Sequence, residues 1–330
     1  MTTRILRWGL LSTARINTAV ITPLRASARN QLTAVASRSA EQAASYAKEW
    51  GIPRHFGSYE ALLADPQIDV VYISLPNSLH PEWAIKAAQA GKHVLCEKPM
   101  ALEPEDVDAI AAAGKRAGVV IAEAFMYRHH PLTLKIKELV DGGAIGKLKH
   151  VRGGFSFPLN RPADVRFDPV LGGGSIWDIG CYPISYTRTV VGAEPESVFG
   201  WQVNSQSGVD ESFVGQMRFP GEVYGQFDCS FRAAERMLME FVGEKGMLSL
   251  THAYKPGLDE TIHFMHADGT TENIIVPGQE LYIGEVEDMA DAILLGKPPR
   301  ISLADSRGNA ATISALLRSA RAGWPVALAA

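Results

Sequence analysis

The sequence predicts an N-terminal α/β domain with a doubly wound parallel sheet, followed by an α+β domain. Short apolar segments alternate with helical ones over residues 1–123, as expected of parallel strands joined by helices. Over residues 124–330, strand-like segments instead follow one another before two final helices. A third observation is the apolar segment 94–96, which ends in Glu97-Lys98-Pro99. Ligands bind outside the carboxyl ends of strands in such sheets, so we expect Lys98 to meet a cofactor.

Length and composition limit the classes of function. A chain of 330 residues can form two domains, and its net charge of −4 gives no attraction for nucleic acid or an anionic membrane. The basic stretch 147–152 is short and interrupted, so we expect a solvated turn and strand edge. The three cysteines (Cys96, Cys181 and Cys229) form no CxxC pair, and no apolar run approaches membrane-spanning length. With no signal peptide recognised, we expect a cytoplasmic protein.

The elements of the first half follow from apolar runs and helix signals. Helix 104–117 starts with a proline followed by acidic residues, which suit a first helical turn. The predicted strands are 5–11, 32–36, 70–75, 94–96 and 119–122, and the predicted helices are 14–24, 40–50, 81–90 and 104–117.

The turn after the first strand is where such sheets bind a dinucleotide. Its three usual glycine positions carry Ser12, Ala14 and Asn17, so the GxGxxG signature is absent. Small side chains at Ser12 and Ala14 still permit close backbone approach, and the Ser12 and Thr13 hydroxyls could bond a pyrophosphate. Taken alone, the turn favours a connection between strand and helix that binds nothing.

The end of the second strand favours NADP over NAD. NAD-binding domains tend to place an acid there to bond the ribose 2′-hydroxyl. This chain has Ser37-Arg38-Ser39, and an arginine can pair with a 2′-phosphate or stack on adenine. Ser39 also fits a helix N-cap beside a solvated arginine, and both roles can hold together.

The loop after the strand ending at Leu75 reads Pro76-Asn77-Ser78-Leu79-His80. Asn77 and His80 are expected on the same sheet edge as Lys98, although a lone histidine there could simply cap a helix.

The second half changes from alternation to consecutive strands. Turn signals such as Pro220-Gly221 and Asp268-Gly269 separate several of them. The predicted strands are 198–204, 213–219, 223–231, 237–242, 262–266 and 272–276, with helices at 131–140, 285–295 and 303–322.

The glycine-rich stretch 172–183 carries the remaining chemistry. Asp178 and Tyr182 stand four residues apart and could share one helix face. Gly180 and Pro183 predict an interruption, with a new helix starting near Pro183. The alternative is a flexible loop with a buried tyrosine. Hydride transfer needs a group that takes the hydroxyl proton, and a nearby ammonium such as Lys98 would favour the phenolate that tyrosine needs for this role.

Other chemistries find no support in the sequence. His129 and His130 are adjacent rather than at zinc-binding spacing, and neither HExxH nor GxSxG occurs. We therefore predict no metal site and no nucleophilic serine.

Five segments in order resemble the glucose–fructose oxidoreductase / inositol dehydrogenase / MocA (Gfo/Idh/MocA) family: 8–16, 76–80, 91–99, 123–128 and 172–183. Within it, 12–15 and 178–182 resemble the NADP-dependent D-xylose dehydrogenases and dimeric dihydrodiol dehydrogenases. The resemblance implies a Rossmann domain (1–123) and a substrate-binding, oligomerisation domain (124–330) with a large open, mostly antiparallel sheet. It also implies that this sheet forms a homodimer interface.

The resemblance also implies roles for single residues. Lys98 and Tyr182 would be the catalytic pair with Asp178 in support; many relatives have histidine at the Tyr182 position. Arg128, Phe157 and Phe167 could contact the substrate or simply pack, and Asp178 and Tyr182 would contact it too. The expected NADP contacts are Ser12, Thr13, Ala14, Arg15, Ile16, Ser37, Arg38, Leu75, Pro76, Asn77, His80, Glu97 and Lys98.

The expected activity is NADP(H)-dependent hydride transfer at a secondary alcohol or carbonyl of a sugar such as D-xylose or of a cyclic trans-diol. Reduction of a ketosugar or nucleotide-linked ketosugar is an alternative, and a non-catalytic NADP-binding sensor is another. The sequence does not fix the substrate, the direction, the strictness for NADP, or dimer against tetramer.

Overall fold

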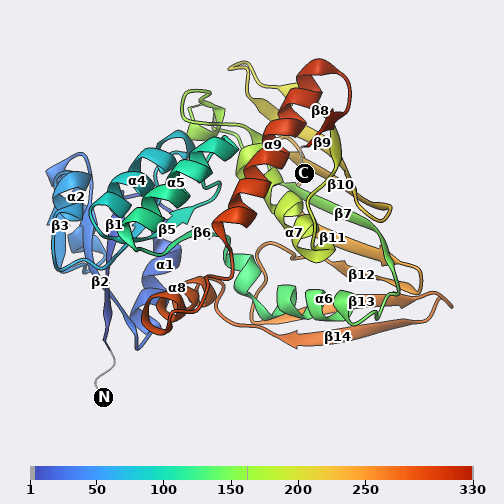
Figure 1. The fold of residues 1–330 in the computed structure, drawn as a ribbon, viewed down its shortest axis with the longest axis horizontal. Coiled ribbons are helices and arrows are strands. Elements are labelled where there is room, and N and C mark those ends of the chain that lie inside the picture. Colours follow the sequence, from blue (N-terminus) through green and yellow to red (C-terminus); the bar gives the residue numbers. More distant parts are fainter. Residues whose placement is uncertain (1–3, 162, 329–330) are drawn as a thin grey trace. The chain divides into compact units, whose positions relative to one another are not determined.

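The computed structural model describes residues 4–161 and 163–328, and in it the chain forms two compact units (Figure 1). The first comprises the described residues of Met1–Met126 together with Tyr282–Arg307. The second comprises those of Tyr127–Leu281 and Gly308–Ala330. The prediction kept residues 282–307 with the second domain, whereas the structure packs this segment in the first unit.

The first unit contains the predicted doubly wound sheet. Its six strands lie in the order β3-β2-β1-β4-β5-β6, and their pairs are parallel. The strands are β1 (Leu6–Leu11), β2 (Asn30–Ala36), β3 (Arg54–Phe56), β4 (Val70–Ile73), β5 (His93–Glu97) and β6 (Ile121–Ala124). The helices are α1 (Asn17–Ala26), α2 (Ala40–Glu49), α3 (Tyr59–Leu63), α4 (His80–Gln89), α5 (Pro104–Ala117) and α8 (Ile283–Leu295). The short elements β3 and α3 were not predicted.

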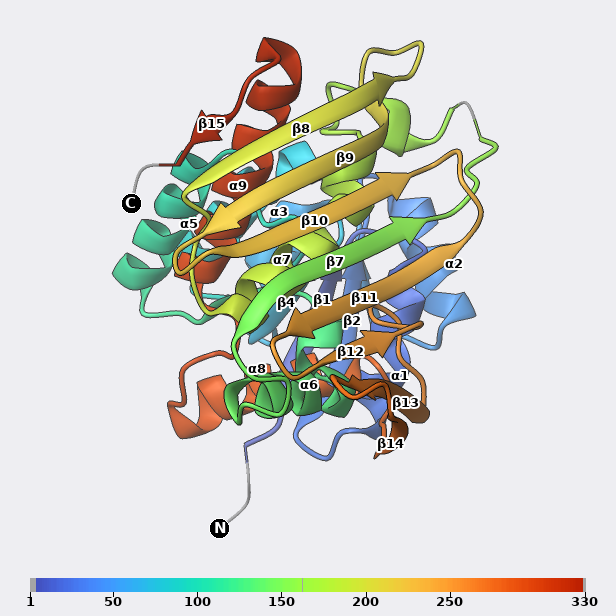
Figure 2. The same ribbon diagram turned by 90° about the vertical axis from the view of Figure 1, so that its right-hand side faces the viewer.

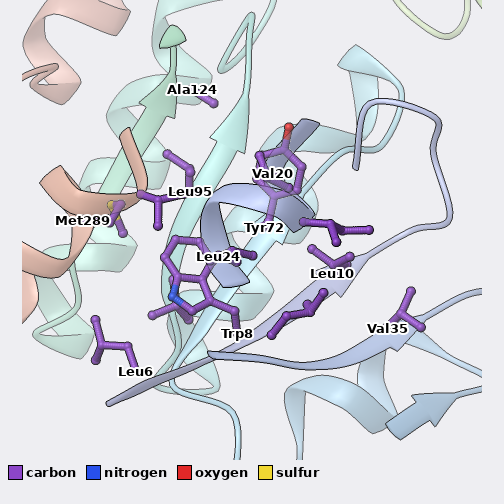
Figure 3. Packing of buried hydrophobic residues seen from close by; sticks show 14 of the residues in the cluster. Leu6, Trp8, Leu10, Val20, Leu24, Val35, Tyr72, Leu95, Ala124 and Met289 are labelled. Carbon is purple, nitrogen blue, oxygen red and sulfur yellow. The ribbon is translucent and has the colours of Figure 1, made fainter. Parts of the chain in front are cut away.

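A hydrophobic core explains why α8 belongs to this unit. Trp8 and Tyr72 are almost fully buried on the sheet face that meets α1 (Figure 3). Val286 and Met289 of α8 are buried in the same cluster. Removing such side chains from water stabilises a fold by about 1.5–3 kcal/mol each. This burial holds α8 to the first unit despite its distant place in the sequence.

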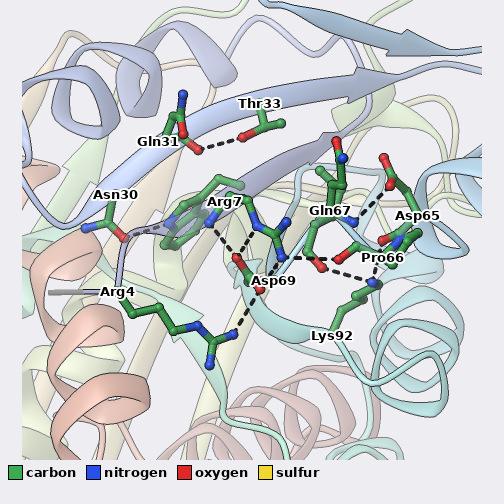
Figure 4. Close-up of polar contacts among 12 residues, drawn as sticks. Arg4, Arg7, Asn30, Gln31, Thr33, Asp65, Pro66, Gln67, Asp69 and Lys92 are labelled. Carbon is green, nitrogen blue, oxygen red and sulfur yellow. Dashed lines mark hydrogen bonds and ion pairs between the residues drawn. The ribbon is translucent and has the colours of Figure 1, made fainter. Parts of the chain in front are cut away.

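A cluster of charged side chains braces β1 against the start of β4. Asp69 accepts hydrogen bonds from the Arg7 backbone N at 2.9 Å, from Arg7 Nε at 2.8 Å and from Arg4 Nη2 at 3.0 Å (Figure 4). The buried amine of Lys92 donates nearby to the carbonyls of Asp65 and Ile68. The Asp69 carboxylate and the Lys92 amine are thereby both paired, as buried charged groups require.

The second unit is built on a nine-stranded sheet in the order β14-β13-β12-β11-β7-β10-β9-β8-β15 (Figure 2). Among the strand ladders that the described residues form in this sheet, only β7 and β10 run parallel, which confirms a mostly antiparallel sheet. The strands are β7 (Leu148–Ser156), β8 (Ser197–Asn204), β9 (Asp210–Phe219), β10 (Val223–Ser230), β11 (Arg236–Gly243), β12 (Gly246–Leu250), β13 (Asp259–His266), β14 (Thr271–Pro277) and β15 (Val326–Ala327). The helices are α6 (Pro131–Asp141), α7 (Cys181–Val191) and α9 (Leu303–Ala322), which begins in the first unit.

The expectation of a solvated turn and strand edge at 147–152 was correct only in part. Lys147 lies in a bend, but the residues after it begin β7, which is an interior strand paired with β11 on one side and β10 on the other. Its exposed residues His150 and Arg152 alternate with buried Val151 and Gly153, as expected of a strand with one face exposed to solvent. Strand β12 was also missed.

The prediction of a new helix near Pro183 is confirmed, since α7 begins at Cys181. No break precedes it, because a π-helical turn, Ile176–Gly180, runs directly into α7. An added Cβ at Gly180 would lie 2.9 Å from Cys229 Sγ, so this glycine permits close packing rather than ending a helix. Among the described residues, no helix is both long and apolar enough to cross a membrane.

Candidate active site

The turn between β1 and α1 is held by a buried network of hydroxyl and amide groups. Ser12 has a φ of 133°, a conformation that favours glycine. Its Oγ lies 2.7 Å from Ser74 Oγ and accepts a hydrogen bond from Ala14 N at 3.0 Å. Asn17 donates to the Ser12 carbonyl at 2.8 Å and accepts from Ser74 Oγ at 2.6 Å. Side-chain hydrogen bonds therefore fix a turn that glycines usually form.

The outer part of this turn is open to a ligand. Arg15 and Ile16 are exposed, and Thr13 and Ala14 are partly so. The turn leads into the N-terminus of α1, whose backbone dipoles favour an anion such as a phosphate.

At the end of β2, Arg38 is exposed while Ser37 is buried. Ser39 caps α2 by accepting from Gln42 N at 3.2 Å, as the alternative interpretation expected. Burial raises the pKa of Tyr59 and the nearby Arg38 guanidinium opposes this rise, so Arg38 lies close to the Tyr59 hydroxyl. The segment Ser37-Arg38-Ser39 contains no acidic side chain that would repel a 2′-phosphate.

The loop that carries Lys98 is tied to its neighbours on both sides. Tyr72 donates to the Glu97 carboxylate, which also accepts from Lys98 N at 3.2 Å. Glu123 of β6 accepts from Met100 N at 2.7 Å. Lys98 itself is partly exposed. These bonds fix the backbone on which the Lys98 ammonium stands.

His80 connects this loop with the one that follows β4. Its ring is fully buried, with Nδ1 2.7 Å from the Pro99 carbonyl and Nε2 2.8 Å from the Leu75 carbonyl. Burial lowers the pKa of His80 and the two carbonyls oppose this. Both ring nitrogens are thus taken up by backbone carbonyls, and the ring ties the loop after β4 to the loop after β5. Pro76 and Asn77 beside it are both partly exposed.

In the second unit, Asp178 lies in the π-helical turn and Tyr182 in the first turn of α7. Helix α7 packs directly on β7 because Gly153 has no side chain; a Cβ there would lie 2.6 Å from Pro183 Cβ. The Asp178 carboxylate accepts from Arg166 Nε at 2.6 Å. The π-helical turn and α7 carry Asp178 and Tyr182 on one continuous helical segment.

Asp210 anchors the start of this turn from β9. Its Oδ2 accepts from Ser175 Oγ at 2.5 Å and from Ile176 N at 2.8 Å. Burial raises the pKa of Asp210, and these hydrogen bonds oppose the rise. Gly174 beside it has a φ of 126°, and a Cβ there would lie 2.3 Å from Asp210 Oδ1.

Tyr182 is 5% exposed and sits among aromatic rings. The ring centroids of Tyr127, Phe155 and Tyr254 lie 5.7, 5.4 and 5.6 Å from its own. Tyr127 also donates to the Tyr182 carbonyl at 3.4 Å. Such packing leaves the ring few rotamers, which suits a group that must hold a proton at one place.

The predicted substrate residues Phe157 and Phe167 meet at Phe231, at centroid distances of 5.6 and 5.7 Å. Phe157 also lies 6.3 Å from Phe155. A continuous aromatic row thus runs through Tyr182, Phe155, Phe157, Phe231 and Phe167. Arg128 is buried and donates to Ser185 Oγ of α7 at 3.1 Å.

Sequence reasoning missed Arg166 and Asp210. Neither residue belongs to a recognisable motif. Arg166 lies in a short loop turn and bonds Asp178, and Asp210 lies on β9 and bonds Ser175. The described residues hold no group of three or more His, Cys, Asp or Glu side chains placed to bind a metal ion.

Comparison with known proteins decides the family. A family model described as "Oxidoreductase family, NAD-binding Rossmann fold" matches residues 6–125, and the C-terminal domain model of the same family matches 133–249. The chain belongs to the Gfo/Idh/MocA family. Its relatives in this family include a D-xylose 1-dehydrogenase (NADP(+)) of Haloferax volcanii, which is 36% identical over 97% of this chain and 99% of its own.

Other members of the family point to related chemistry. A trans-1,2-dihydrobenzene-1,2-diol dehydrogenase of Xenopus laevis is 32% identical over 91% of this chain and 93% of its own. A 3-ketoreductase from Actinomadura kijaniata, solved with NADP and TDP-benzene, superposes with a TM-score of 0.91. It shares 28% identity and covers 96% of this chain and 98% of its own. This Gfo/Idh/MocA protein is therefore an oxidoreductase.

Proposed function

We propose that this protein transfers hydride between NADP(H) and a secondary alcohol or carbonyl of a sugar such as D-xylose, or of a cyclic trans-diol. The observation that carries the proposal is the helical segment on which Asp178 and Tyr182 stand, beside a row of aromatic rings. It provides an acceptor for substrate hydroxyls, a proton-holding phenol and apolar faces for a ring. D-xylose dehydrogenase and dihydrodiol dehydrogenase relatives support both substrate classes.

The first unit fits NADP at two places. The turn from Ser12 to Ile16 leads into a helix N-terminus suited to the pyrophosphate. The exposed Arg38 follows β2 where NAD-binding domains carry an acid, and its planar fork suits the 2′-phosphate. When bound, NADP supplies the nicotinamide that accepts or returns the hydride.

The chain's own residues move the proton. In the direction of oxidation, Tyr182 takes the proton of the substrate hydroxyl, and in reduction it returns the proton to the carbonyl oxygen. The ammonium of Lys98 stabilises the phenolate by its charge. Asp178, held by Arg166, orients the substrate by accepting from one of its hydroxyls. Exclusion of water by the aromatic row strengthens each of these interactions.

The same site suits the reverse reaction on a larger substrate. The match to a 3-ketoreductase solved with NADP and TDP-benzene favours a nucleotide-linked ketosugar as the second candidate. A non-catalytic NADP-binding sensor, the third, would bind cofactor without turnover.

The exposed face of the nine-stranded sheet supports a homodimer. Trp201 and Val214 face each other across β8 and β9, and Figure 2 shows this face. The exposed apolar side chains are Trp201 (56%), Val203 (59%), Val214 (48%), Tyr224 (43%), Met265 (43%) and Ile275 (63%). Apolar patches of this kind mark interaction surfaces, and two copies can cover each other symmetrically. Light scattering should give twice the chain mass, and Trp201→Glu should reduce it to that of a monomer.

The first experiment titrates the protein with NADPH and NADH by tryptophan fluorescence and then screens sugars, diols and ketosugars for turnover. We expect tighter binding of NADPH and turnover of at least one polyol. Tyr182→Phe should bind NADPH normally and lose about 10²–10⁴-fold in kcat, the usual contribution of a general acid/base. Near-normal turnover by this variant would exclude Tyr182 from the role, and cofactor binding without any turnover would support the sensor.

A further inference from the structure

In the second unit, the Arg166 guanidinium lies between the carboxylates of Asp164 and Asp178. Its Nε donates to Asp178 Oδ2 at 2.6 Å and its Nη1 to Asp164 Oδ1 at 3.2 Å. Across residues 4–161 and 163–328, Nη2 meets no hydrogen-bond acceptor, and the side chain is 37% exposed. The guanidinium therefore has donors left to offer beside the carboxylate that we assign to the substrate.

The backbone of Arg166 is fixed relative to Asp178. The Asp164 side chain accepts from Arg166 N at 3.1 Å, which caps the short turn Val165–Phe167. The Arg166 carbonyl accepts from Gly174 N at 2.9 Å, and the Gly174 carbonyl accepts from Asp178 N at 3.1 Å. A Cβ on Gly173 would lie 2.5 Å from the Arg166 carbonyl oxygen. This close backbone contact and the ion pair make Arg166 part of a built site rather than a mobile surface side chain.

The charges around the pair favour this arrangement. The charge of Asp178 raises the pKa of Arg166 against the effect of burial, and Asp164 adds to the rise. The guanidinium is thus a permanent cation whose planar fork sets the plane of the Asp178 carboxylate. The next residue, Phe167, belongs to the aromatic row, which places an apolar face beside these polar groups.

We infer that Arg166 makes the site specific for vicinal diols. One substrate hydroxyl donates to the Asp178 carboxylate, and its neighbour accepts from Arg166 Nη2. An acceptor and a donor held in one ion pair match two adjacent hydroxyls, whereas an alcohol with a single hydroxyl leaves one of them unpaired. This inference rests on the proposed function and names the feature of the substrate that the site reads.

The test compares trans-cyclohexane-1,2-diol with cyclohexanol as substrates for the full-length protein with NADP⁺. We expect Arg166→Ala to lower kcat/KM about 10²-fold for the diol but only about tenfold for cyclohexanol. This variant should bind NADPH as the wild type does. Guanidinium chloride should restore part of the diol activity to this variant. Arg166→Lys keeps the charge without the fork, so it should lose the diol preference and gain nothing from guanidinium. Arg161→Ala, an exposed arginine of the same loop, should behave as wild type.

An unchanged diol-to-cyclohexanol ratio in Arg166→Ala and Arg166→Lys would overturn the inference while wild-type turnover left the proposed function standing. An equal loss in Arg161→Ala would overturn it too, because a general change in the loop's charge would then explain the effect. If the wild-type protein binds NADPH but oxidises neither compound nor any sugar, the proposed function and the inference fall together.

Discussion

Replacing Asp69 by asparagine should destabilise the first unit in a pH-dependent way. Burial alone would raise the pKa of this carboxyl, but hydrogen bonds from the Arg7 side chain and backbone and from Arg4 outweigh it and lower the pKa from 3.8 to about 2 (Figure 4). That difference corresponds to about 2.5 kcal/mol of stability. Because the Arg4 and Arg7 side chains are 65% and 36% exposed, water and salt reduce the interaction, and we expect about 1–2 kcal/mol.

The sign follows from proton linkage. A carboxyl whose pKa is lower in the folded state adds stability above its unfolded pKa and loses it as the pH falls through the folded pKa. Asp69→Asn should therefore cost its full amount at pH 7, while the difference from wild type shrinks between about pH 4 and pH 2. Urea unfolding at pH 7, 5, 4 and 3, followed by tryptophan fluorescence, measures this difference.

Arg4→Gln is the matched control, because Arg4 makes only one of the bonds and is mostly exposed. It should cost about 0.5 kcal/mol or less. A difference between wild type and Asp69→Asn that stayed constant from pH 7 to pH 3 would refute the reasoning, since neutral hydrogen bonds or packing would then account for it.

Three further predictions follow from single positions. Arg38→Ala should weaken NADPH about 10–100-fold and leave NADH unchanged; equal weakening in a fluorescence titration would remove Arg38 from the 2′-phosphate. Gly174→Ala should destabilise the protein by about 2–4 kcal/mol in urea, because its Cβ would meet Asp210 at 2.3 Å, whereas Gly208→Ala, also at positive φ but with nothing within 4 Å, should cost only about 1 kcal/mol. Ser12→Ala should be less stable than Ser12→Gly by about 1 kcal/mol, because both lose the hydroxyl but only alanine keeps the strain of a φ of 133°; the reverse order would show that the turn relaxes.

The sequence predicted the parallel sheet well because its strands are buried on both faces and bounded by clear turn signals. Strand β5 ends with Glu97 in the structure, so Lys98 stands at the carboxyl edge as expected. Strand β7 escaped prediction because its exposed side chains are basic and two glycines follow them. Gly153 allows α7 to pack on the strand, because a Cβ there would lie 2.6 Å from Pro183 Cβ, and this requirement is visible only in three dimensions.

The site was predictable to the extent that its residues are neighbours in the chain. The new helix near Pro183 was predicted correctly, since α7 begins at Cys181, but the sequence did not show that a π-helical turn at Ile176–Gly180 leads into it without a break. A glycine can relieve strain or make room, and sequence alone does not separate the two. The partners of the site were out of reach: Asp210 meets Ser175 across 35 residues, and nothing in the intervening sequence predicts that contact.

Both units fix their reactive turns by the same physical means. In the first, buried Ser12, Ser74 and Asn17 hold the start of α1. In the second, buried Asp210 and Ser175 hold the start of the turn that leads to Tyr182. A buried polar group is costly unless it is fully paired, so each network tolerates only one arrangement of its loop. The glycines that usually shape such turns give freedom without this restriction, which explains how the β1–α1 turn can lack all three of them and still hold one conformation.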